Sequence, residues 1–147
     1  SYYLSAFGEH LTGEEIERAV ADAAAGLALE VADYSVGSIL PDESSVAGRH
    51  VYVVEFSGGD PGSEAVAAFL ARVDETIAAG NESYATRRGT TLDAPEAAVL
   101  PPGSFVDWMR QRGKLGDQHK VPRVINDAAL FQSLLDLAAS TRPERPG

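Results

Sequence analysis

The sequence predicts an α+β domain in which helices pack on a mainly antiparallel sheet of about four strands. Three observations lead to this fold class: four segments with strand-like composition, four segments with apolar residues at helical spacing, and the order β-α-β-β-α-β-α-α along the chain. The chain has 147 residues, of which 44% are apolar, and this length and composition suit one domain with a hydrophobic core.

The predicted strands are short and rich in β-branched, aromatic or aliphatic residues. The first covers residues 2–7, and the second covers residues 29–40 and ends before a Pro-Asp turn. Residues 49–56, with the sequence RHVYVVEF, are the clearest strand because valine and tyrosine cluster there. The fourth strand covers residues 97–100 and ends against two prolines.

Each predicted helix has a start signal, and two of the four have a stop signal as well. In chain order the start signals are the T-x-x-E capping box of Thr12 and Glu15, then Asp60-Pro61, then residues 101–104, and finally Asn126 or Asp127. Gly80-Asn81 ends the second predicted helix, and Gly113 ends the third. The last eight residues, STRPERPG, contain two prolines and no apolar anchor. We therefore expect a domain of residues 1–139 and a disordered tail of residues 140–147. The chain opens on serine, and we expect it to begin inside a longer protein.

The net charge of −10 and the absence of cysteine limit the classes of function. The chain has 22 acidic and 12 basic residues, so its overall electrostatic field repels nucleic acid and anionic membranes. We therefore expect neither as a partner. Without cysteine there are no disulfides, thiolate metal sites or cysteine nucleophiles. No apolar run approaches the ~20 residues of a membrane span, and no signal segment opens the chain. We expect a cytoplasmic monomer.

The sequence contains no self-contained catalytic motif. His10, His50 and His119 lack the spacing of zinc ligands, so no metal site is predicted. The G-x-S-x-G elbow and the glycine-rich phosphate loops are also missing. His50 lies beside a predicted strand, and we interpret it as a strand-edge residue.

Two segments are candidates for function. In the first, residues 7–17, a strand runs into Gly8 and then into a capped helix, which presents Glu9 and His10 at the corner. In the second, residues 113–123, both lysines of the chain lie in a glycine-containing basic loop. Pro122 favours an extended residue before it, so Lys120 is expected to project from a loop. A mobile positive tip suits a phosphate or a carboxylate. An ordinary connection and a solvated basic loop are the alternatives.

Charge also differs between the two halves of the sequence. Residues 1–80 hold 14 acids and 3 bases, whereas residues 81–147 hold 8 acids and 9 bases. An anionic ligand is therefore expected to lie against the second half.

Together these segments resemble a known family. Residues 8–17 are similar to the G-E-K-[LI]-x-x-x-E-[IL]-E segment that opens the small C-terminal domain of adenylate-forming enzymes. Residues 102–105 and 118–123, PGSF and QHKVPR, resemble the more specific P-G-[TS]-F and Q-[YH]-K-x-P-R patterns of the acyl acid–amido synthetases named for an auxin-responsive promoter. Residues 81–84, followed by Arg87, resemble a third family segment. The resemblance spans roughly residues 2–130 and suggests a bacterial member.

The resemblance implies a C-terminal lid domain of an ATP-dependent ligase. Such an enzyme joins a carboxylic acid to AMP and then transfers the acyl group to an amine or amino acid. ATP, with Mg²⁺, would be bound mainly by the N-terminal adenylation domain of the same chain, and the isolated fragment is expected to be inactive. Lys120 is the implied catalytic residue. The residues implied to contact the nucleotide are Gln118, His119, Arg123, Gly8, Glu9 and His10.

Three positions depart from the family pattern, and two other functions remain open. His10 stands where the superfamily usually has a lysine or arginine, His119 stands where plant members commonly have tyrosine, and Lys114 has no counterpart. One alternative is a stand-alone α+β module that binds or senses a small molecule. The other is the lid of a thioester-forming acyl-CoA synthetase, which shares the first segment but fits residues 118–123 less well. The substrates are not encoded in this part of the chain.

Overall fold

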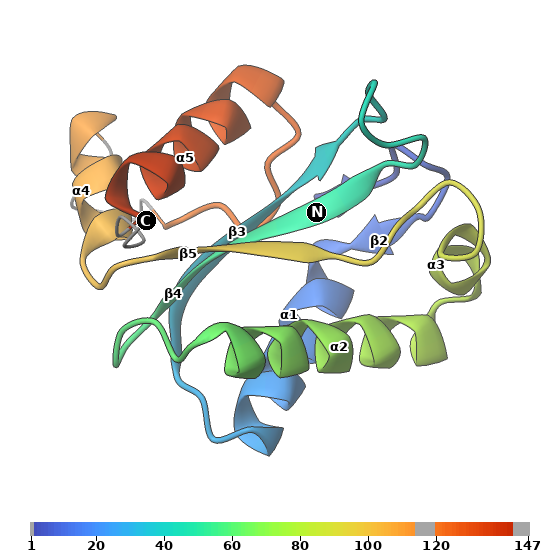
Figure 1. The fold of residues 1–147 in the computed structure, drawn as a ribbon, viewed down its shortest axis with the longest axis horizontal. Coiled ribbons are helices and arrows are strands. Elements are labelled where there is room, and N and C mark those ends of the chain that lie inside the picture. The colour runs from blue at the N-terminus through green and yellow to red at the C-terminus, as the bar shows by residue number, and fades with distance from the viewer. Residues whose placement is uncertain (1, 114–119, 143–147) are drawn as a thin grey trace.

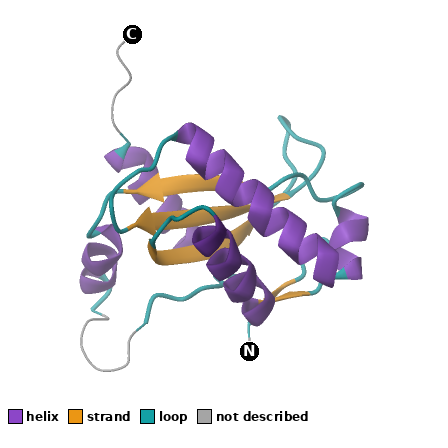
Figure 2. Cartoon of the chain, turned by 90° about the horizontal axis from the view of Figure 1, so that it is seen from below, coloured by secondary structure: helices purple, strands orange, loops and turns teal. Residues whose placement is uncertain are grey.

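A three-stranded sheet separates two layers of helices (Figure 1). The structure, a computed structural model, describes residues 2–113 and 120–142. The sheet contains β3 (Val31–Ile39), β4 (Arg49–Phe56) and β5 (Glu96–Leu100). Helices α1 (Gly13–Gly26) and α2 (Ser63–Gly80) cover one face, and Figure 2 shows them crossing in front of the strands. Helices α4 (Ser104–Gln111) and α5 (Ala128–Thr141) cover the other face.

The α+β class is confirmed, but the sheet is smaller than predicted and mixed. Strand β4 is central, with β3 antiparallel on one side and β5 parallel on the other. The predicted strand of residues 2–7 does not join this sheet. Only β1 (Tyr3–Leu4) is extended there, and it pairs with β2 (Leu11–Thr12) in a separate two-stranded sheet. The chain turns back on itself at Gly8 before it can extend further, because the backbone there takes a φ of 81°.

The outer edge of β3 is covered by residues 122–125, which we call the anchor segment. The amide of Val36 donates to the carbonyl of Arg123 at 2.7 Å, and the amide of Ile125 donates to the carbonyl of Val36 at 2.9 Å. Val36 and Val124 thus form a parallel bridge. The anchor segment takes the place of a fourth strand and satisfies polar groups that an open edge would expose.

Two hydrophobic clusters, one on each face, hold the layers together. Along β4 the side chains alternate between them: Tyr52, Val54 and Phe56 face α1 and α2, whereas Val51 and Val53 face α4 and α5. A strand that is buried on both faces has a nearly continuous run of apolar residues in its sequence. This explains why residues 49–56 gave the clearest strand pattern. On β3, a Cβ added at Gly37 would lie 2.6 Å from the ring of Phe131, so glycine is what lets α5 approach the sheet closely.

Helix boundaries agree with several of the sequence signals and differ at others. The capping box of Thr12 and Glu15 starts α1 as predicted. The short helix α3 (Glu82–Arg87) was not predicted, and it begins where the side chain of Asn81 accepts from the Tyr84 amide at 2.9 Å. Helix α5 continues to Thr141, two residues into the predicted tail, and residues 143–147 lie outside the described residues.

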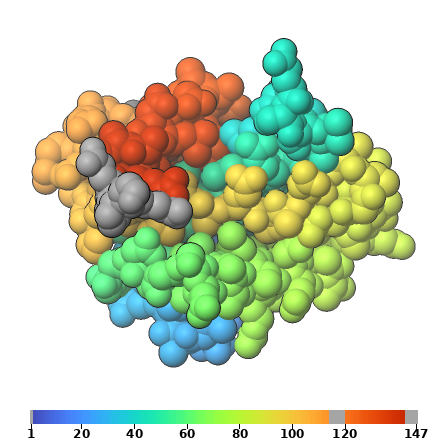
Figure 3. Space-filling view, in the orientation of Figure 1, coloured from blue at the N-terminus to red at the C-terminus, as the bar shows by residue number. Residues whose placement is uncertain are grey.

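One surface connection stands out from the rest of the fold. The connection between β3 and β4 projects from the body of the domain (Figure 3), and it carries the exposed side chains of Leu40 and Val46. None of the described helices combines the length and the apolar composition that crossing a bilayer requires.

Candidate functional site

A groove of about 700 Å³ brings together parts of the two segments selected from the sequence. Its size lies in the range of ligand pockets. One part of its lining comes from the first turns of α1, at Gly13, Glu14 and Glu17. The rest comes mainly from Arg112 at the end of α4 and from residues 120–127. The fold therefore places the start of the first helix beside residues 120–123, the described end of the second segment, although about a hundred residues separate them in sequence.

Lys120 lies on this groove with an exposed side chain. Within residues 2–113 and 120–142, no carboxylate lies within ion-pair distance of its ammonium group. An exposed lysine on a flexible four-carbon stem is a point charge that can turn toward an anion. The position of Lys120 therefore suits a group that acts outward, toward another body, rather than one that stabilises this domain.

Arg112 reaches the groove from the C-terminal end of α4, a helix whose N-terminal end is tied to the sheet. Its guanidinium carbon lies 4.6 Å from the centre of the Trp108 ring, a cation–π contact. At the other end of α4, the amide of Phe105 donates to the buried carboxylate of Glu55 at 2.9 Å. A carboxylate at a helix N-terminus satisfies an otherwise unpaired amide and interacts favourably with the helix dipole. The PGSF motif thus holds α4, and Arg112 with it, against the sheet.

Arg123 also lines the groove, but its guanidinium is engaged within the domain. Nη1 donates to Oδ1 of Asp33 at 2.9 Å and to the carbonyl of Tyr34 at 3.1 Å. The guanidinium carbon lies 4.5 Å from the centre of the Tyr34 ring. The predicted nucleotide contact by Arg123 would therefore compete with three contacts inside the fold.

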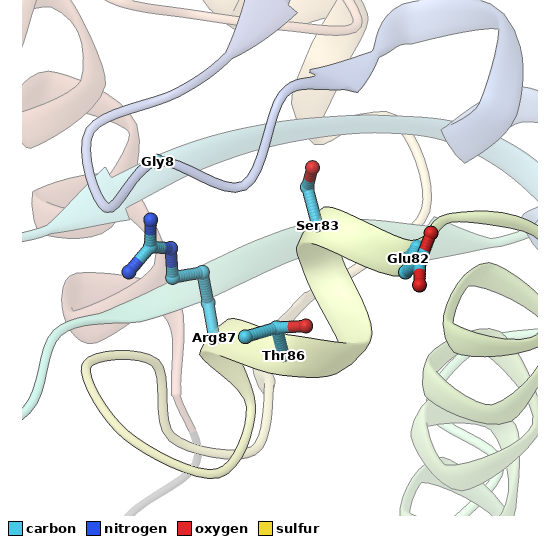
Figure 4. A pocket seen from close by; sticks show the side chains of 5 residues that line it. All are labelled: Gly8, Glu82, Ser83, Thr86 and Arg87. Atoms are coloured by element: carbon cyan, nitrogen blue, oxygen red, sulfur yellow. The ribbon is translucent and has the colours of Figure 1, made fainter.

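Gly8 and His10 lie away from the groove that holds Lys120. Gly8 lines a second cavity of about 260 Å³, formed with α3, where Ser83 and Arg87 point toward the loop that carries Gly8 (Figure 4). The φ of 81° at Gly8 favours glycine, and a Cβ there would lie 2.9 Å from Nε of Arg87, which would have to move. His10 is exposed, and its carbonyl accepts from the amide side chain of Asn81 at 3.1 Å. The structure therefore does not bring Gly8 and His10 to Lys120.

Glu9 points into the fold, although the sequence predicts that it is presented at the corner before α1. Its side chain is completely buried, and its carboxylate accepts from Nε2 of His50 at 2.6 Å and from the Phe7 amide at 2.8 Å. His50 is 1% exposed, so it is a core residue rather than the strand-edge residue expected from the sequence. Its Nδ1 has no hydrogen-bond partner among the described residues. This pair ties the corner before α1 to β4, and the nucleotide contact implied for Glu9 stays a prediction.

A second polar cluster supports the same region. The Tyr84 hydroxyl donates to Asp74 at 2.6 Å, and Arg88 donates to both oxygens of that carboxylate at 2.8 and 2.9 Å. The Tyr84 ring lies beside His50, with 6.1 Å between ring centres. The arginine that completes this cluster is Arg88, one residue beyond the Arg87 selected from the sequence. The third family segment therefore joins α3 to α2 and to the corner before α1.

Two carboxylates in these clusters have pKa values below the ordinary range. Burial by itself raises the pKa of Glu9, but hydrogen bonds, chiefly from His50, outweigh burial and lower it. Burial also raises the pKa of Asp74, and the hydrogen bonds from Arg88 and Tyr84 outweigh it in the same way. A group whose pKa is lowered on folding stabilises the fold above its unfolded-state pKa, and this stabilisation is lost as the pH falls through its folded-state pKa.

The fold is therefore expected to lose stability in acid. The denaturant midpoint should fall progressively as the pH drops below about 4.5, near the ordinary pKa values of Glu and Asp. Urea unfolding at a series of pH values measures this, and the double variant Glu9→Gln with Asp74→Asn should show a flatter acid dependence than the wild type. Equal acid dependence in the two proteins would show that other groups control it.

The remaining predicted residues, Gln118 and His119, lie outside the described residues. Among the residues that are described, no group of three or more potential metal-ligating side chains comes together. Sequence reasoning missed the contribution of Arg112, Glu14 and Glu17 to the groove. The available signal was that Glu14 and Glu17 lie inside the first selected segment and that Arg112 directly precedes the second.

Comparisons with known proteins give one family and one fold. A family model described as the GH3 family C-terminal domain matches residues 14–129. A solved structure of "GH3.15 acyl acid amido synthetase" superposes with a TM-score of 0.75 at 22% identity, over 96% of this chain and 25% of that one. "AtGH3.15 acyl acid amido synthetase in complex with 2,4-DB" gives 0.72 at 20% identity, over 92% and 25%. No curated protein matches the chain. The chain spans about a quarter of the length of these solved synthetases.

Proposed function

The chain belongs to the GH3 family, whose C-terminal domain it forms, and on this premise we propose that it is the lid domain of an ATP-dependent acyl acid–amide synthetase. The family match confirms the resemblance seen in the sequence motifs, and the solved structures share the fold. Membership of this family argues against the lid of an acyl-CoA synthetase. It also argues against a stand-alone sensor, because the related solved chains are about four times longer than this one.

The observation that carries this proposal is the placement of Lys120. Its ammonium group is exposed on a groove, while the backbone just after it is hydrogen-bonded to β3. A charge that faces outward from a fixed support can act on a reaction held by a neighbouring domain. The neighbour proposed here is the N-terminal adenylation domain of the same chain.

The proposed reaction has two steps. A carboxylate oxygen attacks the α-phosphorus of ATP, the bond to pyrophosphate breaks, and an acyl-adenylate forms. An amine then attacks the acyl carbon, and AMP leaves. In the first step two anions approach each other, and the Lys120 ammonium offsets their repulsion. Withdrawal of the lid would then admit the amine, which is a gating step of the kind common in enzymes with moving domains.

The described lining of the groove carries no net positive charge of the kind that suits a nucleotide. Among residues 2–113 and 120–142, it contains three acids, Glu14, Glu17 and Asp127, and three bases, Arg112, Lys120 and Arg123. ATP carries several negative charges, so a balanced lining provides little net attraction. This supports the proposal that ATP, with its Mg²⁺, is bound mainly by the rest of the synthetase.

The isolated 147-residue chain is therefore expected to bind ATP weakly or not at all. Isothermal titration with MgATP should give no saturable signal for this chain, whereas the intact protein should bind. The intact protein is the positive control, and inorganic phosphate added to the isolated chain tests for general anion binding. Tight MgATP binding by the isolated chain would place the nucleotide pocket in this domain and favour the stand-alone module.

A further inference from the structure

The backbone that carries Lys120 is held in place on one side by the anchor segment, residues 122–125. Besides the two backbone hydrogen bonds to Val36, the hydroxyl of Ser35 donates to the carbonyl of Pro122 at 2.5 Å. Ser35 is completely buried, so this hydrogen bond is shielded from water. Three backbone groups of the anchor segment, the carbonyls of Pro122 and Arg123 and the amide of Ile125, are thus paired with two residues of β3.

The anchor segment is also packed on both faces of the sheet. Val124 joins the hydrophobic cluster under α1 and α2, whereas Ile125 joins the cluster under α4 and α5. Val121 packs against the second cluster as well. Pro122 has a fixed φ and restricts Val121 to extended geometry. The Cα of Lys120 is three residues from that of Arg123 and lies within about 11 Å of it.

The side chain of Arg123 clamps this segment to β3. Its Nη1 is shared between Asp33 and the Tyr34 carbonyl, and its flat face covers the Tyr34 ring. Burial raises the pKa of the Tyr34 phenol to about 12, so the ring is neutral at physiological pH. These contacts need a planar guanidinium, because an ammonium group lacks the flat face that stacks on the ring.

We propose that Arg123 is a positioning residue for Lys120: its clamp on Asp33 and Tyr34 fixes the backbone from which Lys120 projects, and it does not grip the nucleotide. This inference rests on the proposed function of Lys120. It gives Arg123 a positioning role in place of the nucleotide contact that the family resemblance implied. The physical reason is that a reacting charge must be placed within a fraction of an ångström, and a shift of about 1 Å can cost a hundredfold in rate.

Two conservative variants separate positioning from nucleotide contact. Arg123→Lys keeps a positive charge but loses the planar clamp, and Asp33→Asn weakens the clamp while leaving the guanidinium in place. Arg110→Ala is the matched control, because Arg110 is exposed on α4 and pairs only with Asp107 among the described residues. A cooperative unfolding transition and a circular dichroism spectrum like that of the wild type would establish that each variant is folded.

The intact synthetase is used, with ATP–pyrophosphate exchange over a panel of carboxylic acids. Both Arg123→Lys and Asp33→Asn are expected to lower kcat about tenfold, with an unchanged KM for ATP, because the charge is misplaced rather than removed. Hydrogen exchange read by mass spectrometry, which needs no activity, should be faster at the amides of Val36 and Ile125. The control variant should match the wild type in every measurement.

Two results would overturn the proposal. A raised KM for ATP in Arg123→Lys, with wild-type behaviour in Asp33→Asn, would mean that Arg123 contacts the nucleotide. Unchanged hydrogen exchange in both variants would mean that the clamp does not hold the anchor segment. Failure of the proposed function looks different: Lys120→Ala would then leave pyrophosphate exchange intact, and hydrogen exchange would still decide whether Arg123 orders the segment.

Discussion

Replacing Lys120 by alanine in the intact protein is expected to slow adenylate formation by about a hundredfold or more, the scale seen when one preorganised electrostatic group is removed. The reason is the repulsion between the substrate carboxylate and the α-phosphate, which the ammonium group offsets only while the bond forms. An interaction that strengthens in the transition state lowers kcat when it is lost, and it changes KM much less. ATP–pyrophosphate exchange measures this step without the amine.

The matched comparison is Lys114→Ala, which removes the only other lysine of the chain. Lys114 has no counterpart in the family pattern, so its removal should have a much smaller effect on exchange. Lys120→Arg retains the charge in a larger, planar group, and partial activity would show that charge matters as well as placement. Near-wild-type exchange by Lys120→Ala would remove Lys120 from the chemistry.

Sequence patterns predicted the elements whose cause is local. The capping box of Thr12 and Glu15 depends on residues three apart, and it starts α1 as expected. The nearly continuous apolar composition of β4 indicates a strand that is buried on both faces, and the sequence predicted this strand with its correct bounds.

The features that were missed depend on contacts between distant residues. The burial of Glu9 requires His50, 41 residues away, and no pattern near either residue indicates that they pair. The anchor segment reads as a loop because it contains Pro122 and carries little strand signal, yet it pairs with Val36, 88 residues earlier than Val124. The parallel direction of β5 follows from the path of α2 and α3 across the sheet, which local composition does not encode.

Glu9→Ala is expected to destabilise the domain by about 3 kcal/mol, because removing one partner of a buried pair leaves the other without compensation. His50 is almost fully buried, and its Nδ1 already lacks a partner among the described residues. Loss of the carboxylate would leave Nε2 unpartnered as well, together with the Phe7 amide. Urea unfolding at pH 7, followed by circular dichroism, measures the change in the free energy of unfolding.

Two further variants make the result specific to this pair. Glu9→Gln keeps an acceptor oxygen for His50 and should cost only about 1–2 kcal/mol, the range for a weakened buried hydrogen bond. Asp107→Ala removes an exposed carboxylate that pairs with Arg110, and exposed pairs contribute about 0–1 kcal/mol. If Glu9→Ala were as mild as Asp107→Ala, the carboxylate would not be needed inside the fold. Glu9 would then again be available to a ligand, as the family resemblance implied, and the corner before α1 would have to open to expose it.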